Sequence, residues 1–256
     1  MTDLSGRHGL VVGVANKRSI AWAIAQRLAG CGVRLALTYA DERLGENVRA
    51  LAASLDAPLI LPCDVTSDDQ VRAVYGEIGE AFGSLDYLVH AVAFAPRAEL
   101  TGRFLDTSRD GFRIALDVSV YSLIALARGA APLMRGQGAG SVLTLTYLGA
   151  RRVFPNYNVM GVAKAGLEAT VRYLAADLGP ENIRVNAISA GPIRTLASAG
   201  ISGFSDILQV YRDRAALKRN VDAGEVAEAA FFLLTSATAI TGECLAVDAG
   251  YNIMGM

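Results

Sequence analysis

Two side chains in the second half of the chain have the types and the spacing for electrostatic and hydrogen-bond chemistry. Tyr157 precedes Lys164 by seven residues, which is two turns of a helix and places both side chains on one face. A phenol donates a hydrogen bond, and an unperturbed lysine with a pKa near ~10 holds a positive charge at neutral pH. By spacing alone an alternative stays open, in which the tyrosine is a core or interface residue and the lysine a solvated charge on an apolar stem.

The elements that must position this pair alternate along the chain. Short apolar runs indicate strands, and longer segments with helical periodicity separate them. This order is typical of a parallel sheet covered on both faces, so we predict an α/β fold with one Rossmann-type, doubly wound sheet of about seven strands. No linker or repeat interrupts residues 1–256, which we predict to be a single domain. Strands are expected at residues 9–14, 34–39, 59–62, 87–91, 141–146, 184–190 and 243–247, and helices at 19–28, 46–55, 67–82, 107–134, 158–178 and 224–234.

The loop after the first predicted strand has features of a dinucleotide site. Gly13 suits a tight turn where a backbone approaches a pyrophosphate, and Ser19 begins a helix whose free N–H groups bind anions. The loop departs from G-x-G-x-x-G, because Ala15 occupies the second position and the third glycine is absent. A plain turn and a plain N-cap are the alternative, but a strand before the loop and a helix after it favour the cofactor.

The ends of the second and third predicted strands carry carboxylates. Asp41 and Glu42 lie about where a Rossmann domain binds the adenosine ribose, so NADH is expected in preference to NADPH, although Arg43 is compatible with NADPH. The alternative is that both acids only begin a solvated helix. Asp64 and Val65 are expected beside the adenine, and the alternative for Asp64 is a simple turn.

Composition excludes several other classes of function. The chain has 24 basic and 25 acidic residues, so we expect neither nucleic acid nor an anionic membrane as a partner. The apolar stretch 227–234 is too short to span a bilayer, and the N-terminus lacks the pattern of a signal peptide. Three scattered cysteines lack metal-ligand spacing and indicate a reducing compartment. These cysteines are Cys31, Cys63 and Cys244. We therefore expect a cytoplasmic protein that binds no metal ion.

The residues around Tyr157 identify a family that the chain resembles. Short-chain dehydrogenases place a tyrosine four positions before the lysine, and here that position holds Met160, which cannot donate a proton. The Tyr-x₆-Lys spacing and the run Ser-Ala-Gly-Pro-Ile-Arg-Thr at 189–195 resemble the NADH-dependent bacterial enoyl-acyl-carrier-protein reductases, a divergent branch of that superfamily. The similarity covers essentially the whole chain, with its marked segments at 13–25, 64–65, 90–96, 147–149, 155–164, 184–196 and 247–251.

The resemblance implies a role for individual residues. Tyr157, Lys164 and Tyr147 match the catalytic positions, and Ala95, Tyr147 and Tyr157 match substrate contacts. The positions that match the cofactor site are Gly13, Ser19, Ile20, Asp64, Val65, Val92, Lys164, Ile193, Arg194, Thr195, Leu196 and Ala197.

The resemblance also implies a reaction. Hydride from NADH would reduce the carbon–carbon double bond of trans-2-enoyl thioesters on acyl carrier protein, the last reductive step of fatty acid elongation. Tyr157 would stabilise the enolate, and whether it or water supplies the proton stays open. Residues 193–219 would form a mobile substrate-binding flap, and relatives are usually homotetramers. A 3-ketoacyl or carbonyl reductase would require a tyrosine at the position of Met160, and a non-catalytic NAD-sensing protein is the remaining alternative.

Overall fold

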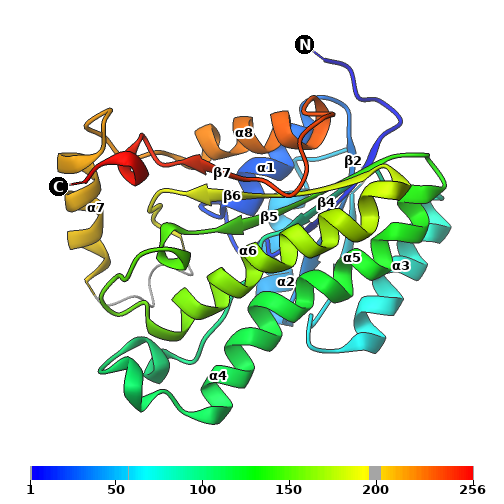
Figure 1. Ribbon diagram of the computed structural model, residues 1–256. Coiled ribbons are helices and arrows are strands. Elements are labelled where there is room, and N and C mark those ends of the chain that lie inside the picture. The colour runs from blue at the N-terminus through cyan, green and yellow to red at the C-terminus, as the bar shows by residue number, and fades with distance from the viewer. Residues whose placement is uncertain (1, 57, 196–202, 256) are drawn as a thin grey trace.

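Seven parallel strands form the centre of the molecule in the order β3-β2-β1-β4-β5-β6-β7 (Figure 1). The computed structural model describes residues 2–56, 58–195 and 203–255. The order of the strands reverses between β1 and β4, which pair directly. The predicted fold class and all seven strands are confirmed. The strands are β1 (His8–Val12), β2 (Arg34–Tyr39), β3 (Leu59–Pro62), β4 (Tyr87–His90), β5 (Gly140–Thr146), β6 (Ile183–Ala190) and β7 (Cys244–Val247).

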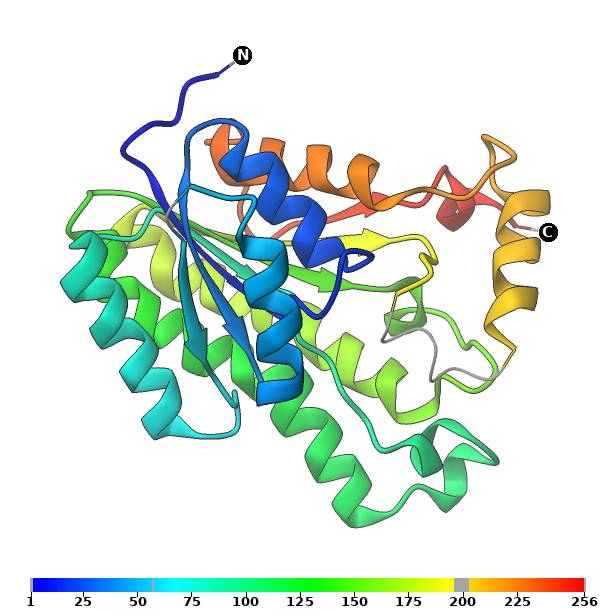
Figure 2. The same cartoon turned by 180° about the vertical axis from the view of Figure 1, so that it is seen from behind.

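Helices cover both faces of this sheet (Figure 2). On one face α1 (Ile20–Ala29), α2 (Glu42–Ala52) and α8 (Ala223–Thr235) form one core layer with the sheet. On the other face α3 (Asp68–Phe82), α5 (Ser122–Arg135) and α6 (Asn158–Leu178) form the second layer, and α4 (Arg109–Leu116) continues into α5. Because side chains of a strand alternate between faces, Val11 packs in the first layer while Leu10 and Val12 pack in the second. Short 3₁₀ turns occur at Arg97–Leu100, Phe104–Asp106, Leu148–Ala150, Gly179–Glu181 and Tyr251–Ile253.

Three predicted segments differ from the structure. The helix expected at 46–55 is present, but its bounds are wrong. α2 begins at Glu42, because Asp41 caps it by accepting the N–H of Leu44 at 2.9 Å, and it ends at Ala52. The helix expected at 107–134 is interrupted by a π-helical turn at Asp117–Tyr121. The segment 193–219, which has only partial periodicity, contains α7 (Phe204–Arg214), which lies beside the C-terminal segment.

Among the residues that the structure describes, one helical segment is apolar enough to cross a bilayer by length and composition alone. It is Arg109–Arg135, and its most apolar window has a mean hydropathy of 1.5 with half of the window buried inside the protein. The buried half packs with α3 and α6 against the sheet.

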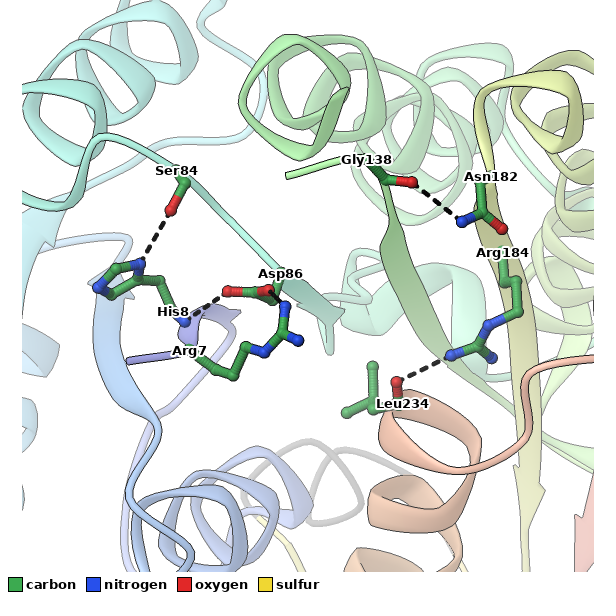
Figure 3. A network of polar contacts seen from close by, with 8 residues as sticks. All are labelled: Arg7, His8, Ser84, Asp86, Gly138, Asn182, Arg184 and Leu234. Atoms are coloured by element: carbon green, nitrogen blue, oxygen red, sulfur yellow. Dashed lines mark hydrogen bonds and ion pairs between the residues drawn. The ribbon is translucent and has the colours of Figure 1, made fainter. Parts of the chain in front are cut away.

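The amino ends of the strands are closed by polar groups that bind one another (Figure 3). Arg7 and Asp86 form an ion pair at 2.6 Å, and the same carboxylate accepts the backbone N–H of His8 at 2.8 Å. Further along this edge Arg184 donates to the carbonyl oxygen of Leu234 at 2.9 Å. Because the polar groups at the amino edge bind one another, the candidate site is expected at the opposite, carboxyl edge, where α/β proteins bind their ligands.

Candidate active site

Gly13 sits at the point where the strand order reverses, between the ends of β1 and β4. Its φ of 106° is accessible to glycine, and a Cβ there would overlap the carbonyl oxygen of Ala91. The loop after β1 therefore lies directly against the loop after β4. This crevice is where doubly wound sheets bind dinucleotides.

Ser19 is the N-cap of α1, but its side chain does not cap the helix. Its hydroxyl instead accepts the N–H groups of Ala15 at 3.2 Å and Asn16 at 3.0 Å, which folds the loop back on itself. The first N–H groups of α1, beginning at Ile20, lack the acceptor that a capping side chain would supply, and such groups bind anions. The geometry of this loop therefore fits the pyrophosphate of a dinucleotide.

The carboxylates at the ends of β2 and β3 bind groups of the protein itself, close to them in the sequence. Asp41 caps α2, and Glu42 pairs with Arg49 at 3.0 Å, so the structure shows the alternative in which both acids begin a solvated helix. Asp64 accepts the N–H and the hydroxyl of Thr66 at 2.9 and 2.7 Å. Val65 is buried in the core layer beside it. These contacts neither require nor prevent an adenosine at this edge.

Tyr147 and Tyr157 meet at the carboxyl edge of the sheet from two different elements. Tyr147 directly follows β5, and Tyr157 directly precedes α6, whose first residue is Asn158. Their rings are 5.1 Å apart and nearly perpendicular, and Gly149 has no Cβ at the place that the Tyr157 ring occupies. The helix predicted at 158–178 is confirmed, so Tyr157 is the N-cap of α6, and the backbone N–H of Met160 donates to its carbonyl oxygen at 2.9 Å.

Burial holds both tyrosines in their protonated form. It raises the pKa of Tyr157 well above the usual range, and Tyr147 adds to that effect. It raises the pKa of Tyr147 in the same direction. Two phenols that stay neutral at physiological pH present hydrogen-bond donors to an oxyanion.

Lys164 lies on α6 and is almost fully buried. Its Nζ donates to the carbonyl oxygen of Leu145, at the end of β5, at 2.8 Å. Burial lowers the pKa of Lys164 to about 8, and the carboxylate of Glu168 one turn along the helix opposes that effect. The alternative that Lys164 is a solvated charge, which the spacing left open, is therefore excluded.

Met160 occupies the position at which a short-chain dehydrogenase has its tyrosine. It is 6% exposed and packs in an apolar cluster with Ala95 and Ala163, against which Tyr157 also lies. Val92, before Ala95 in the same loop, packs against the second core layer. The structure thus places the predicted substrate contact Ala95 beside the predicted catalytic tyrosine.

Sequence reasoning missed two side chains that support this site. Ser119, in the π-helical turn, holds the loop after β4 by bonding both the N–H and the carbonyl oxygen of Phe94, at 3.1 and 3.2 Å. Glu168 is buried and accepts from Thr146 at 3.1 Å and Arg151 at 2.9 Å. Its spacing of four residues from Lys164 is the signal in the sequence that places both on one face.

The predicted cofactor segment after β6 is described as far as Thr195, and Leu196 and Ala197 lie outside the described residues. Ile193 packs against the core beside Ala215. Arg194 donates to Ser205 in the first turn of α7 at 3.3 Å. Within the described ranges, no group of three metal-ligating side chains occurs.

A doubly wound sheet with an anion-binding turn at its switch point, and with a buried lysine and two protonated tyrosines beside it, defines a dinucleotide-dependent oxidoreductase. Residues 13–252 match the family model described as enoyl-(acyl carrier protein) reductase. The chain belongs to this enoyl-(acyl carrier protein) reductase family.

Close relatives cover the chain from end to end. The enoyl-[acyl-carrier-protein] reductase [NADH] of Bacillus subtilis is 53% identical, with 98% of each chain covered, and that of a Synechocystis species is 51% identical over all of both chains. The Bacillus cereus reductase, solved with NADP⁺ and an indole naphthyridinone, has a TM-score of 0.97 and 51% identity over all of both chains. The Anaplasma phagocytophilum reductase, solved with NAD, has a TM-score of 0.95 and 47% identity, with 100% of this chain and 98% of that chain covered.

Proposed function

We propose that this chain reduces the carbon–carbon double bond of trans-2-enoyl thioesters carried on acyl carrier protein, with NADH as the reductant, in fatty acid synthesis. The observation that carries the proposal lies at the carboxyl edge of the sheet. There Tyr147 contacts Tyr157 and Lys164 bonds Leu145 at the end of β5, while Met160 is buried where a ketone reductase needs its tyrosine. One domain, residues 1–256, both holds the cofactor and performs the reaction.

Different residues at this edge bind different parts of NADH. NADH supplies the hydride for the β-carbon of the enoyl group. Gly13 and the N-terminus of α1, at Ser19 and Ile20, hold the pyrophosphate. Lys164, which already points to the end of β5, donates to the ribose hydroxyls. The remaining residues of the proposed site are Asp64, Val65, Val92, Ile193, Arg194, Thr195, Leu196 and Ala197.

The tyrosines act on the substrate. Addition of hydride to the β-carbon places negative charge on the thioester oxygen, and a preorganised donor at that oxygen contributes about 3–4 kcal/mol. Tyr157 is our candidate for this donor because burial keeps it protonated. Tyr147 contacts the Tyr157 ring, and Ala95 belongs to the apolar cluster against which that ring packs, so both are assigned as contacts of the acyl thioester.

One assay separates this proposal from its alternatives. Purified protein is mixed with NADH and crotonyl or 2-dodecenoyl thioester, and in parallel with a 3-ketoacyl thioester, while NADH oxidation is followed. We expect turnover of the enoyl substrates alone. Turnover of the ketoacyl substrate alone would establish a ketoacyl reductase, and NADH binding without any turnover would establish a sensor. The ratio of rates with NADH and NADPH gives the cofactor preference.

The pKa of Lys164 predicts a pH dependence for cofactor capture. The free enzyme's kcat/KM for NADH should be constant below pH 7 and fall as pH rises through about 8, because the ammonium loses its charge and a donor hydrogen. Glu168→Gln removes the charge that raises this pKa, so the fall should begin at lower pH in that variant. A pH profile of kcat/KM that is the same in both proteins would contradict the role of Glu168.

We also propose a homotetramer. Large apolar side chains are exposed on the outer side of the helices that cover one face: Phe112 is 37% exposed, Tyr121 41%, Val162 38% and Tyr173 76%. The unburied half of Arg109–Arg135 lies on this side of the molecule, and a second copy would remove it from water. Sedimentation velocity should give a mass near four times the chain's 26.9 kDa. A monomer at micromolar concentration would contradict this.

Two further proposals concern the substrate-binding flap and the cellular location of the protein. The segment 193–219, of which 196–202 lie outside the described residues, contains the substrate-binding flap, a proposal supported by the partly buried apolar side chains that α7 carries, Phe204, Ile207 and Leu208. The protein works in the cytoplasm, where three free cysteines stay reduced. Fractionation of cells that express the tagged protein would test the location, and limited proteolysis with and without NADH would test the flap.

A further inference from the structure

A column of aromatic rings joins three distant parts of the chain behind Tyr147. Tyr211, in α7, is 1% exposed, and its ring stacks on Tyr251 with 3.7 Å between centroids and 14° between planes. Phe154, from the loop before α6, lies 5.0 Å from the Tyr147 ring and 6.4 Å from the Tyr211 ring. Both ribbon views place α7 beside the C-terminal segment (Figures 1 and 2). The ring of Tyr211 is therefore fixed on several sides.

One hydrogen bond connects this column of aromatic rings to the active site. The hydroxyl of Tyr211 donates to the hydroxyl oxygen of Tyr147 at 3.2 Å. Since Tyr147 accepts this bond, its own proton is free to be donated elsewhere. A hydroxyl that accepts a hydrogen bond becomes a stronger donor.

We propose that Tyr211 is a positioning residue for Tyr147: its hydroxyl orients that of Tyr147 and strengthens it as a donor to the enoyl thioester. Because Tyr211 belongs to α7, the bond exists only while this helix is docked against Tyr251. The docked position of α7 and the orientation of an active-site hydroxyl are thereby linked. The inference rests on the proposed function, and on Tyr147 contacting the substrate.

The electrostatics of the pair agree with this direction of donation. Burial is the main cause that raises the pKa of Tyr211, and its donated bond adds to that effect. The same bond acts in the opposite sense on Tyr147, where it counteracts the effect of burial and lowers the pKa.

The test is a double-mutant cycle with Tyr211→Phe and Tyr147→Phe, in which every ring is kept. With crotonyl thioester and saturating NADH, Tyr211→Phe should lower kcat by roughly three- to tenfold, the effect of one hydrogen bond, without changing the KM for NADH. In the Tyr147→Phe background, Tyr211→Phe should have no further effect. Tyr251→Phe is the matched control, since it removes a hydroxyl from the same stack but keeps the ring, and its kcat should stay within about twofold of the unmodified enzyme's.

Several outcomes would overturn the inference. Tyr211→Phe with full kcat, or with the same loss in both backgrounds, would leave Tyr211 a packing residue only. ¹³Cζ-labelled tyrosine gives a readout without turnover: at neutral pH the Tyr147 resonance should shift in Tyr211→Phe, which removes the bonded hydroxyl, and an unchanged resonance would also overturn the proposal. An unmodified enzyme that turns over no enoyl thioester would instead refute the proposed function.

Discussion

Tyr157→Phe should lower kcat for enoyl thioesters by roughly 10²–10³-fold while the protein stays folded and still binds NADH. The change deletes one hydroxyl and keeps the ring that packs against Tyr147 and Gly149. Loss of one preorganised donor at an oxyanion typically has this effect on kcat. The measurements are the steady-state rate with crotonyl and 2-dodecenoyl thioesters and the affinity for NADH from its fluorescence.

The control for Tyr157→Phe is Tyr173→Phe. Tyr173 lies on the same helix but is 76% exposed, so removing its hydroxyl should leave kcat unchanged. If Tyr157→Phe keeps most of its activity, the donor to the thioester oxygen must be another group, with Tyr147 as the next candidate. If Tyr157→Phe instead loses NADH binding, the hydroxyl belongs to the cofactor site.

Lys164→Met should weaken NADH binding by roughly 10- to 100-fold, the effect of losing one or two charge-assisted hydrogen bonds. Methionine keeps the apolar stem as far as Cε and lacks only the terminal amine, so the packing of α6 against β5 is retained. Burial makes the charged form of Lys164 unfavourable in the folded state, which is why its pKa is about 8 rather than 10.5. The variant should therefore differ in unfolding free energy by no more than about 2 kcal/mol at pH 7, since loss of the bond to Leu145 offsets the relief of the buried charge.

The pH dependence of stability tests the same residue without any activity measurement. Between pH 8 and 10.5 the unfolded chain holds a proton on Lys164 that the folded protein has released. More protons bound in the unfolded state means that Lys164 makes the unfolding free energy rise with pH in this window. Urea unfolding at pH 7 and pH 10 should show that increment in the unmodified protein and not in Lys164→Met. Equal increments in both would mean that Lys164 has an ordinary pKa and is not buried as a charge.

The backbone framework was predictable because it depends on local patterns. Apolar runs and helical periodicity predict the strands and most helices, and seven residues between Tyr157 and Lys164 predict that both face one region. The start of α2 was missed because a side-chain cap at Asp41 outweighed the apolar pattern from which the later start was inferred. The π-helical turn has no local pattern, because its extra residue is accommodated by contacts such as that of Ser119 with Phe94.

The chemistry of the site depended on contacts between distant residues. Spacing alone left Lys164 either buried or solvated, and only the packing of α6 on β5 makes it a buried charge with a lowered pKa. The protonation of His90 also depends on contacts between distant residues. Its burial between Thr144 and Ser122 lowers its pKa to about 3, so the imidazole is neutral at pH 7 and cannot serve as a general acid.

The sequence by itself determined the doubly wound sheet and the family, since strands, helices and motifs are patterns of residues near one another in the chain. The tertiary structure decided that Lys164 is buried, that Glu168 lies near it, and that Tyr211 donates to Tyr147. The last contact joins residues 64 positions apart. No local pattern encodes such a contact, because it exists only when the folded chain brings α7 against the end of β5.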